Sequence, residues 1–455
     1  MVFSGLVFLF LFLPASLLLY YICPVRFRNL LLLLVSLVFY AWGEPKYILI
    51  MIFSAVFDYV NGRLIGRFDA TGKRGASRAV MVVSVVGNLA ILGTFKYAGA
   101  FTGLALPIGI SFYTFQTMSY TIDVYRGEVA PQRNFINFAA YVTMFPQLIA
   151  GPIVRYRTVE KQLESRSVSV DKFADGIRRF IVGLAKKVML ANMAGKLWEY
   201  AFSSPADERT MLMCWLGAIG FTFQIYFDFS GYSDMAIGLG KMFGFDYEEN
   251  FKYPYMQKSI TGFWRTWHIS LGTWFKEYVY IPLGGNKKGV PRQLLNIFIV
   301  WGLTGIWHGA SFNFLVWGLY FALFLIMEKL FLGRALSKAP KFVGHIYTML
   351  VVIVGWVIFA VEDFGDIGGY LAGMFGAGGA FGTEAVYALR KFLPLLAVFA
   401  VGCTNLPSRI AGRFVRAAKP LPRAAAVNLF LFLAFLVCVG LIIGDSYNPF
   451  LYFRF

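Results

Sequence analysis

Residues 296–321 form an uncharged apolar stretch, NIFIVWGLTGIWHGASFNFLVWGLYF. The surrounding chain has no charged residue between Arg292 and Glu328. A helix needs about 20 predominantly apolar residues to span a bilayer. Residues 294–332 are therefore long enough for two spans, and we place the turn between them at Gly309–Asn313. The stretch predicts a helical hairpin inside a membrane.

The composition of the whole chain points to the same class. Of its 455 residues, 58% are hydrophobic and 15% are charged, whereas soluble proteins carry about 25% charged residues. Apolar runs near the spanning length recur along the sequence. We predict an all-α polytopic membrane protein, with a single integral domain over residues 1–455 and roughly 11–12 transmembrane helices.

The formal net charge of +18 has two interpretations. Lys and Arg collect in cytoplasmic loops of membrane proteins, which accounts for most of the excess. The second interpretation adds attraction for anionic lipids or for a phosphate-bearing substrate. Nucleic acid is not an expected partner. The four cysteines are scattered through apolar sequence, so we predict neither a metal site nor a disulfide framework.

Basic residues also predict the orientation. The first span, residues 4–22, has no basic region before it and so differs from a cleaved signal peptide. Arg26 and Arg28 follow it and place the next loop in the cytoplasm. Loops on alternate sides of the membrane follow along the chain. This pattern predicts both termini outside the cell, segment 251–292 on the cytoplasmic side and residues 445–455 in an extracytoplasmic tail.

Residues 134–154, NFINFAAYVTMFPQLIAGPIV, depart from this alternation because basic residues flank both ends. Pro146, Gly151 and Pro152 would break a helix there. A re-entrant or broken segment fits, provided that other protein covers its backbone groups. An ordinary kinked span with one basic flank outside is the alternative.

Two aspartates lie at the end of the expected span 211–231, in YFDFSGYSDMAIG. Ionisable groups at membrane depth usually face the interior of a helix bundle. On this interpretation Asp228 and Asp234 point inward. The alternative is that both cap helix ends near the interface.

His308 is the polar residue that stands out in the uncharged stretch. A helix beginning near Leu294 would place it about 21 Å along the axis, past the middle of the bilayer core. Polar groups are costly there and commonly functional. Gly302, Gly305 and Gly309 would let a ligand or another backbone approach closely. The alternative is a histidine satisfied by an interhelical hydrogen bond.

His268 lies in segment 251–289, which is both basic and aromatic. If the segment is helical, Trp264 and His268 are four residues apart and share a face. Such a helix lies in the headgroup region of a membrane. An interfacial helix with an incidental histidine is the alternative.

Other catalytic patterns are missing from the sequence. There is no GxSxG, no HExxH and no metal-type Cys/His cluster. A phosphate-binding GxxxxGK[ST] is also absent. Imidazole inside a membrane remains, and a neutral imidazole can act as a general base on a hydroxyl group.

Several blocks resemble the membrane-bound O-acyltransferase (MBOAT) family. The block FWRTWHISLGTWFKEYVYIPLGGNKKG, followed by GLTGIWHGASFNFLVWGLY, is similar to the signature region of that family. Further similar blocks are YFDFSGYSDMAIGLGKMFGF, MFPQLIAGPIVRY and LPIGISFYTFQTMSY. The segment IPLGGNKKG favours the alginate-type branch, with teichoic acid D-alanyl transfer as a more distant relation.

The resemblance implies a ring of helices with re-entrant and interfacial helices around a central tunnel. It implies that His308 is catalytic and that His268 is the second signature residue. It also implies acetyl-CoA as the cytosolic acyl donor, with no prosthetic group. We assign donor binding to the aromatic and basic residues of the signature segment: Trp264, Arg265, Trp267 and Lys276.

By the same resemblance, the acyl group leaves toward hydroxyls of an extracytoplasmic polysaccharide, usually through a periplasmic SGNH-type transferase. Relatives carry a similar aromatic C-terminal motif, so Tyr452 in SYNPFLYFRF is a candidate acyl relay; an interfacial anchor is the alternative. The expected location is the inner membrane. A transporter or flippase, a scaffold, or transfer to peptidoglycan, cellulose or teichoic acid remain alternative functions.

Overall fold

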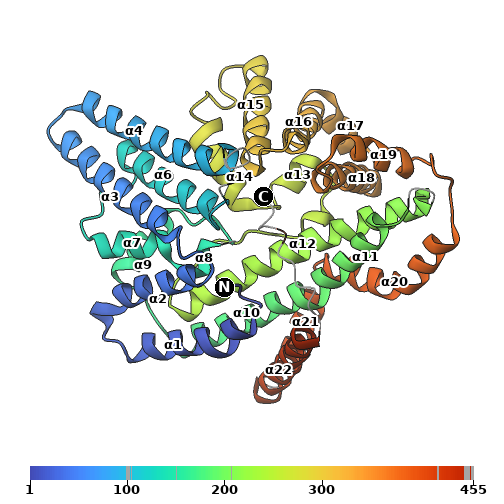
Figure 1. Cartoon of the computed structure of the whole chain (residues 1–455), viewed down its shortest axis with the longest axis horizontal. Helices are drawn as coiled ribbons and strands as arrows, with labels where there is room; N and C mark the ends of the chain where they lie inside the picture. The colour runs from blue at the N-terminus through green and yellow to red at the C-terminus, as the bar shows by residue number, and fades with distance from the viewer. Residues whose placement is uncertain are drawn as a thin grey trace. The chain divides into compact units, whose positions relative to one another are not determined.

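The computed structural model describes residues 1–98, 103, 105–149, 151–205, 208–417, 420–444 and 451. Within these ranges the chain forms helices and no β-strand (Figure 1). The chain divides into two compact units. The first unit comprises Met1–Gly183 and Tyr232–Glu249, and the second comprises Leu184–Gly231 and Asn250–Phe455. The prediction of one integral domain stays a prediction.

The chain is a multi-pass membrane protein, as predicted. Eight helices in the described ranges are long and apolar enough to cross a bilayer, against the expected 11–12. Val290–His308, the first half of the predicted hairpin, is not among the eight. Phe8–Ile22 is a shorter apolar helix. The eight are Val25–Gly43, Ile48–Ala70, Arg74–Ala98, Met211–Met242, Phe312–Lys338, Lys341–Ala360, Thr383–Gly402 and Ala424–Gly444.

The first unit is built around three long helices that pack side by side: α3 (Ile48–Ala70), α4 (Arg74–Gly93) and α6 (Ile110–Arg126) (Figure 1). A buried carboxylate on α3 joins two of them, since Asp58 accepts hydrogen bonds from Ser84 at 2.6 Å and from Asn88 at 2.7 Å. The remaining helices of this part of the chain are α1 (Leu13–Ile22), α2 (Arg28–Gly43), α7 (Phe135–Thr143), α8 (Phe145–Leu148), α9 (Tyr156–Glu164) and α10 (Val170–Ala185), with the π-helical segments η1 (Phe8–Phe12) and η3 (Thr94–Ala98) and the 3₁₀ turn η2 (Val25–Phe27).

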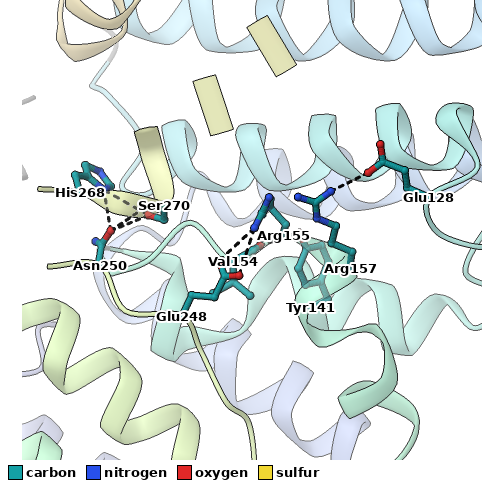
Figure 2. Close-up of polar contacts among 9 residues, drawn as sticks. All are labelled: Glu128, Tyr141, Val154, Arg155, Arg157, Glu248, Asn250, His268 and Ser270. Atoms are coloured by element: carbon teal, nitrogen blue, oxygen red, sulfur yellow. Dashed lines mark hydrogen bonds and ion pairs between the residues drawn. The ribbon is translucent and has the colours of Figure 1, made fainter. Parts of the chain in front are cut away.

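Residues 134–154 are broken, as the sequence predicts. The short helices α7 and α8 are interrupted at Met144, and Pro146 lies in the first turn of α8, where its missing N–H costs nothing. The irregular backbone that follows is covered, because the Tyr141 hydroxyl donates to the carbonyl of Val154 at 3.0 Å (Figure 2). Arg155 then pairs with Glu248 at 3.3 Å. The re-entrant path through the bilayer stays a prediction.

The second unit contains the predicted hairpin of α15 (Val290–His308) and α16 (Phe312–Met327), with its turn where we placed it. The two helices approach closely at Gly305, where a Cβ would collide with the carbonyl oxygen of Phe314. Helix α16 also packs against α18 (Lys341–Ala360).

The other elements of this part of the chain are η4 (Lys186–Ala191), α11 (Asn192–Phe202), α12 (Met211–Met242, in this unit up to Gly231), η6 (Pro254–Met256), α13 (Ile260–Trp264), α14 (Ile269–Phe275), η7 (Lys276–Tyr280), η8 (Glu328–Leu332), α17 (Gly333–Lys338), α19 (Phe364–Met374), α20 (Thr383–Gly402), α21 (Leu406–Ala417) and α22 (Pro420–Gly444). Its core is strongly aromatic: the side chains of Trp317 and Trp356 are both fully buried. These rings surround the site described next.

Candidate active site

A cavity of about 500 Å³ lies in the second unit. This volume is within the range of small-molecule sites. Its walls include every described residue that the sequence suggested for the site: Trp264, Arg265, Trp267, His268, Lys276 and His308. Residues 40 positions apart in the chain thus meet at one hollow.

His268 sits at a break between α13 and α14, so the single helix expected for this segment is wrong. Its φ of 45° lies in the left-handed region, which non-glycine residues rarely adopt. The neighbouring backbone explains how it is held, because Ile269 N–H donates to the carbonyl of Asn250 at 3.0 Å. A tertiary contact therefore overrides the helical pattern and turns the imidazole toward the cavity.

The Asn250 side chain determines which nitrogen of His268 carries the proton (Figure 2). Its Oδ1 accepts from the Ser270 backbone N–H at 3.2 Å and from the Ser270 hydroxyl at 2.9 Å. A backbone N–H can only donate, so this atom is the amide oxygen. His268 Nδ1 lies 3.1 Å from the same oxygen and must carry hydrogen to bond with it.

The opposite nitrogen of His268 is consequently a hydrogen-bond acceptor. Burial lowers the pKa of His268 to about 3, so its imidazole is neutral near pH 7. Nε2 is buried and has no hydrogen-bond partner among the described residues. A buried acceptor of this kind can receive a hydrogen bond, whereas the lowered pKa makes it a weak base.

His308 is the last residue of α15, directly before the turn that the sequence predicts at Gly309–Asn313. Aromatic rings surround its imidazole edge-on, with centroid distances of 5.0 Å to Trp317 and 5.2 Å to Phe359. The Trp307 ring lies at 4.9 Å. These contacts restrict its orientation in apolar surroundings.

The cavity wall has an apolar part and a basic part. Trp267 is buried and packs on Trp356, with ring centroids 4.8 Å apart, and Trp264 packs on Trp301 at 4.6 Å. Arg265 and Lys276 are exposed. The arrangement suits a molecule with an apolar end and an anionic end.

Comparison with known proteins identifies the family. Residues 126–363 match the model of MBOAT, the membrane-bound O-acyltransferase family. The chain belongs to this family. The "Probable alginate O-acetylase AlgI" of Pseudomonas putida is 40% identical over the full length of both chains.

Two further relatives of this O-acyltransferase are more distant. The "Peptidoglycan O-acetyltransferase" of Helicobacter pylori is 32% identical over 83% of this chain and 80% of that protein. The "Teichoic acid D-alanyltransferase" of Bacillus subtilis is 28% identical over 49% and 59%, respectively. The protein is therefore a membrane-bound acyltransferase that uses an acyl donor as substrate.

Sequence reasoning missed part of the acyltransferase site. Asn250 gave no signal, because it lies 18 positions before His268 in an irregular segment. Asp228 was expected to face inward or to cap a helix end. It lies inside the 32-residue helix α12 and lines the cavity, so capping is wrong for it. The same helix contains Asp234, which accepts from Arg179 at 2.7 Å within the first unit.

The C-terminal tail reaches the cavity at Leu451. This residue is buried and lines the same hollow as His268 and His308. Tyr452, the predicted relay residue, lies outside the described residues. The tail was expected from its charge and aromatic content to be an outer segment, and no sequence pattern indicated its contact with the cavity wall.

Proposed function

We propose that this acyltransferase moves an acetyl group from cytosolic acetyl-CoA toward hydroxyls of an extracytoplasmic polysaccharide of the alginate type. The observation that carries this proposal is the pair of imidazoles, His268 and His308, on one cavity of a membrane acyltransferase. The full-length similarity to a protein named alginate O-acetylase supports the acetyl group and the polymer class. The proposed location is the inner membrane, with both termini outside.

The chemistry needs one base and a fixed thioester. In the proposed step the acceptor hydroxyl gives its proton to His308, and its oxygen bonds to the thioester carbonyl carbon. The carbon–sulfur bond breaks, and the leaving thiolate takes the proton from His308. His268 Nε2 accepts a hydrogen bond from a substrate N–H or O–H group and holds it in place. General base catalysis of this kind contributes about 10²–10⁴ in rate.

Charge distribution supports an anionic donor. A second hollow of about 630 Å³ shares Arg265 with the cavity and is also lined by Lys258, Lys329 and Lys341. Phosphates of coenzyme A would meet these cations, with Lys276 nearby on the cavity wall. The indoles of Trp264 and Trp267 would pack against the apolar part of the donor.

Tyr452 is the proposed first acceptor, from which a periplasmic SGNH-type partner takes the acetyl group. The burial of Leu451, the preceding residue, supports this role. Tyr452→Phe should abolish polymer acetylation and leave the amount of folded protein in the membrane unchanged. Full acetylation of the polymer in cells that carry this variant would rule out the relay.

The activity is tested with purified protein and acetyl-CoA labelled in the acetyl group. We expect thioester cleavage or self-acylation that is lost in His308→Ala. His345→Ala is the matched control, because His345 is exposed and lines neither hollow. Unchanged turnover in His308→Ala would rule out His308 as the base, and no turnover in the wild-type protein would favour a transporter or a scaffold.

A further inference from the structure

A buried ion pair lies next to the cavity and has no part in the chemistry described so far. Lys187 Nζ is 2.7 Å from Asp228 Oδ1, and the two side chains are 2% and 3% exposed. Burying both charges costs several kcal/mol per ion, which their attraction offsets only with good geometry and further hydrogen bonds. Such a pair in an apolar helix bundle is commonly functional.

Local contacts hold Lys187 in place. It lies on the π-helical segment η4, one of five such segments in the described residues. Its ammonium also donates to Asn192 Oδ1 at 3.1 Å. The ammonium is thus in contact with both Asn192 Oδ1 and Asp228 Oδ1.

The other carboxylate oxygen binds the C-terminal tail. Asp228 Oδ2 accepts the backbone N–H of Leu451 at 3.0 Å, across 223 positions of sequence. A hydrogen bond to a charged acceptor is about twice as strong as a neutral one. Because the donor is a backbone N–H, the bond holds the main chain of the tail at Leu451.

The docking point belongs to the proposed acetyl-transfer site. Asp228, Leu451, His268 and His308 all line the same cavity. Phe229, the residue after Asp228, contacts the ring of His268 edge-on with centroids 4.7 Å apart. Helix α12 thus links the docked tail to one of the two imidazoles.

We propose that Asp228, charged and oriented by Lys187, is a positioning residue that docks the C-terminal tail in the acyl-transfer cavity. The role of this docking in acyl transfer rests on the proposed function. The docking itself can be measured without any acyl donor. A purely structural role for the ion pair is the competing outcome.

The decisive variant leaves the ion pair intact. Leu451→Pro removes the N–H that Asp228 accepts, and Leu451→Ala retains it as the matched control. We expect Leu451→Pro to lower kcat for acetyl transfer to the acceptor at least about tenfold, with the dissociation constant for acetyl-CoA unchanged. Leu451→Ala loses the buried side chain but keeps the N–H, so it is the reference, and kcat of Leu451→Pro should be at least about tenfold below that of Leu451→Ala. Equal activities of the two variants would overturn the proposal.

A second pair of variants tests Asp228 directly. Lys187→Met with Asp228→Asn removes both charges and keeps an oxygen acceptor, whereas Lys187→Met with Asp228→Leu removes the acceptor too. Each is combined with Leu451→Cys and treated with a water-soluble maleimide, against the same background without that cysteine. We expect labelling at least about tenfold faster in the Asp228→Leu background than in the Asp228→Asn background, where the neutral acceptor retains docking.

The outcomes separate the two proposals. Equal labelling in both backgrounds would overturn docking by Asp228. So would labelling of Leu451→Cys, with Lys187 and Asp228 unchanged, that is as fast as in denatured protein. Contrasting labelling in a protein that shows no thioester cleavage would retain docking and overturn the proposed function.

Discussion

His268 illustrates how one distant side chain sets the chemistry of another. The amide oxygen of Asn250 receives hydrogen bonds from two groups of Ser270, and this fixes its orientation toward His268 Nδ1. The imidazole then keeps its Nε2 unprotonated. The tautomer follows from the donor count at one oxygen, without any charged partner.

Removing this oxygen should therefore impair catalysis more than folding. Asn250→Ala leaves His268 without its tautomer-determining acceptor, and we expect kcat/KM for acetyl-CoA to fall about 10²-fold. Asn250→Asp, which keeps an oxygen acceptor for Nδ1–H, should recover part of the activity. Thermal unfolding in detergent checks that both variants remain folded. Wild-type activity in Asn250→Ala would contradict the assigned role.

The burial of His268 also predicts a pH dependence of stability. Its pKa is about 3 in the folded protein because burial disfavours the imidazolium, against about 6.5 in an unfolded chain. Between these values the unfolded chain binds a proton that the folded protein does not. Acidification through this range should lower the free energy of unfolding by up to about 1.4 kcal/mol per pH unit.

Unfolding temperatures of wild type and His268→Gln at about pH 7 and about pH 4.5 check this prediction. The variant should lose less stability on acidification than the wild type. His345→Gln is the control, since its exposed side chain should leave the wild-type pH dependence unchanged. Identical losses in wild type and His268→Gln would show that the burial of this imidazole does not contribute.

At the scale of elements, the α15–α16 hairpin places His308. Its two helices approach without side chains between them at Gly305, and also at Gly318, where a Cβ would collide with the carbonyl oxygen of Trp301. The residue at the end of α15 is thereby held against the rings on α16. The position of this imidazole depends on the closeness of the two backbones.

We expect Gly305→Ala to force the helices apart and to lower stability by about 1–3 kcal/mol, with a loss of activity because His308 moves. Gly302→Ala is the matched control on the same helix, since the nearest atom to its Cβ is Leu319 Cδ2 at 4.0 Å. That change should be neutral or stabilising by up to about 1 kcal/mol. Thermal unfolding and acetyl transfer measure both. Equal effects of the two alanines would contradict the close approach.

The elements also show what the sequence can and cannot predict. The hairpin and its turn follow from hydropathy and length, and the break in residues 134–154 follows from its prolines. The single helix through Trp264 and His268 was wrong, because its interruption depends on the contact with Asn250, which no local pattern encodes. The same holds for Lys187, Asp228 and Leu451, which meet through the fold from separate parts of the chain.

At the scale of the whole molecule, the strong positive charge has a local expression. Arg265 lines both hollows of the second unit, together with lysines on the signature segment and beyond it. The sequence suggested that part of the net charge of +18 binds phosphate groups. Arg265 and these lysines are where that interpretation can be tested.

Arg265→Gln should raise KM for acetyl-CoA about tenfold and leave kcat nearly unchanged, because the donor's phosphates lie away from the reacting carbon. The effect should shrink as salt is added, since exposed charges are screened. Arg334→Gln is the control, because this arginine is also exposed and lines neither hollow. A lower kcat with an unchanged KM would contradict a role in donor binding.

The contact between Asp228 and Leu451 has a kinetic consequence. Leu451 lies seven residues beyond Gly444, the end of α22, so a short tether joins the tail to its own docking site. Two groups joined by a short stretch of chain have effective concentrations in the millimolar range. In the proposed function, the tail is therefore held near its docking site at an effective concentration in the millimolar range. A free peptide with the sequence of the tail should compete with it only at about millimolar concentration.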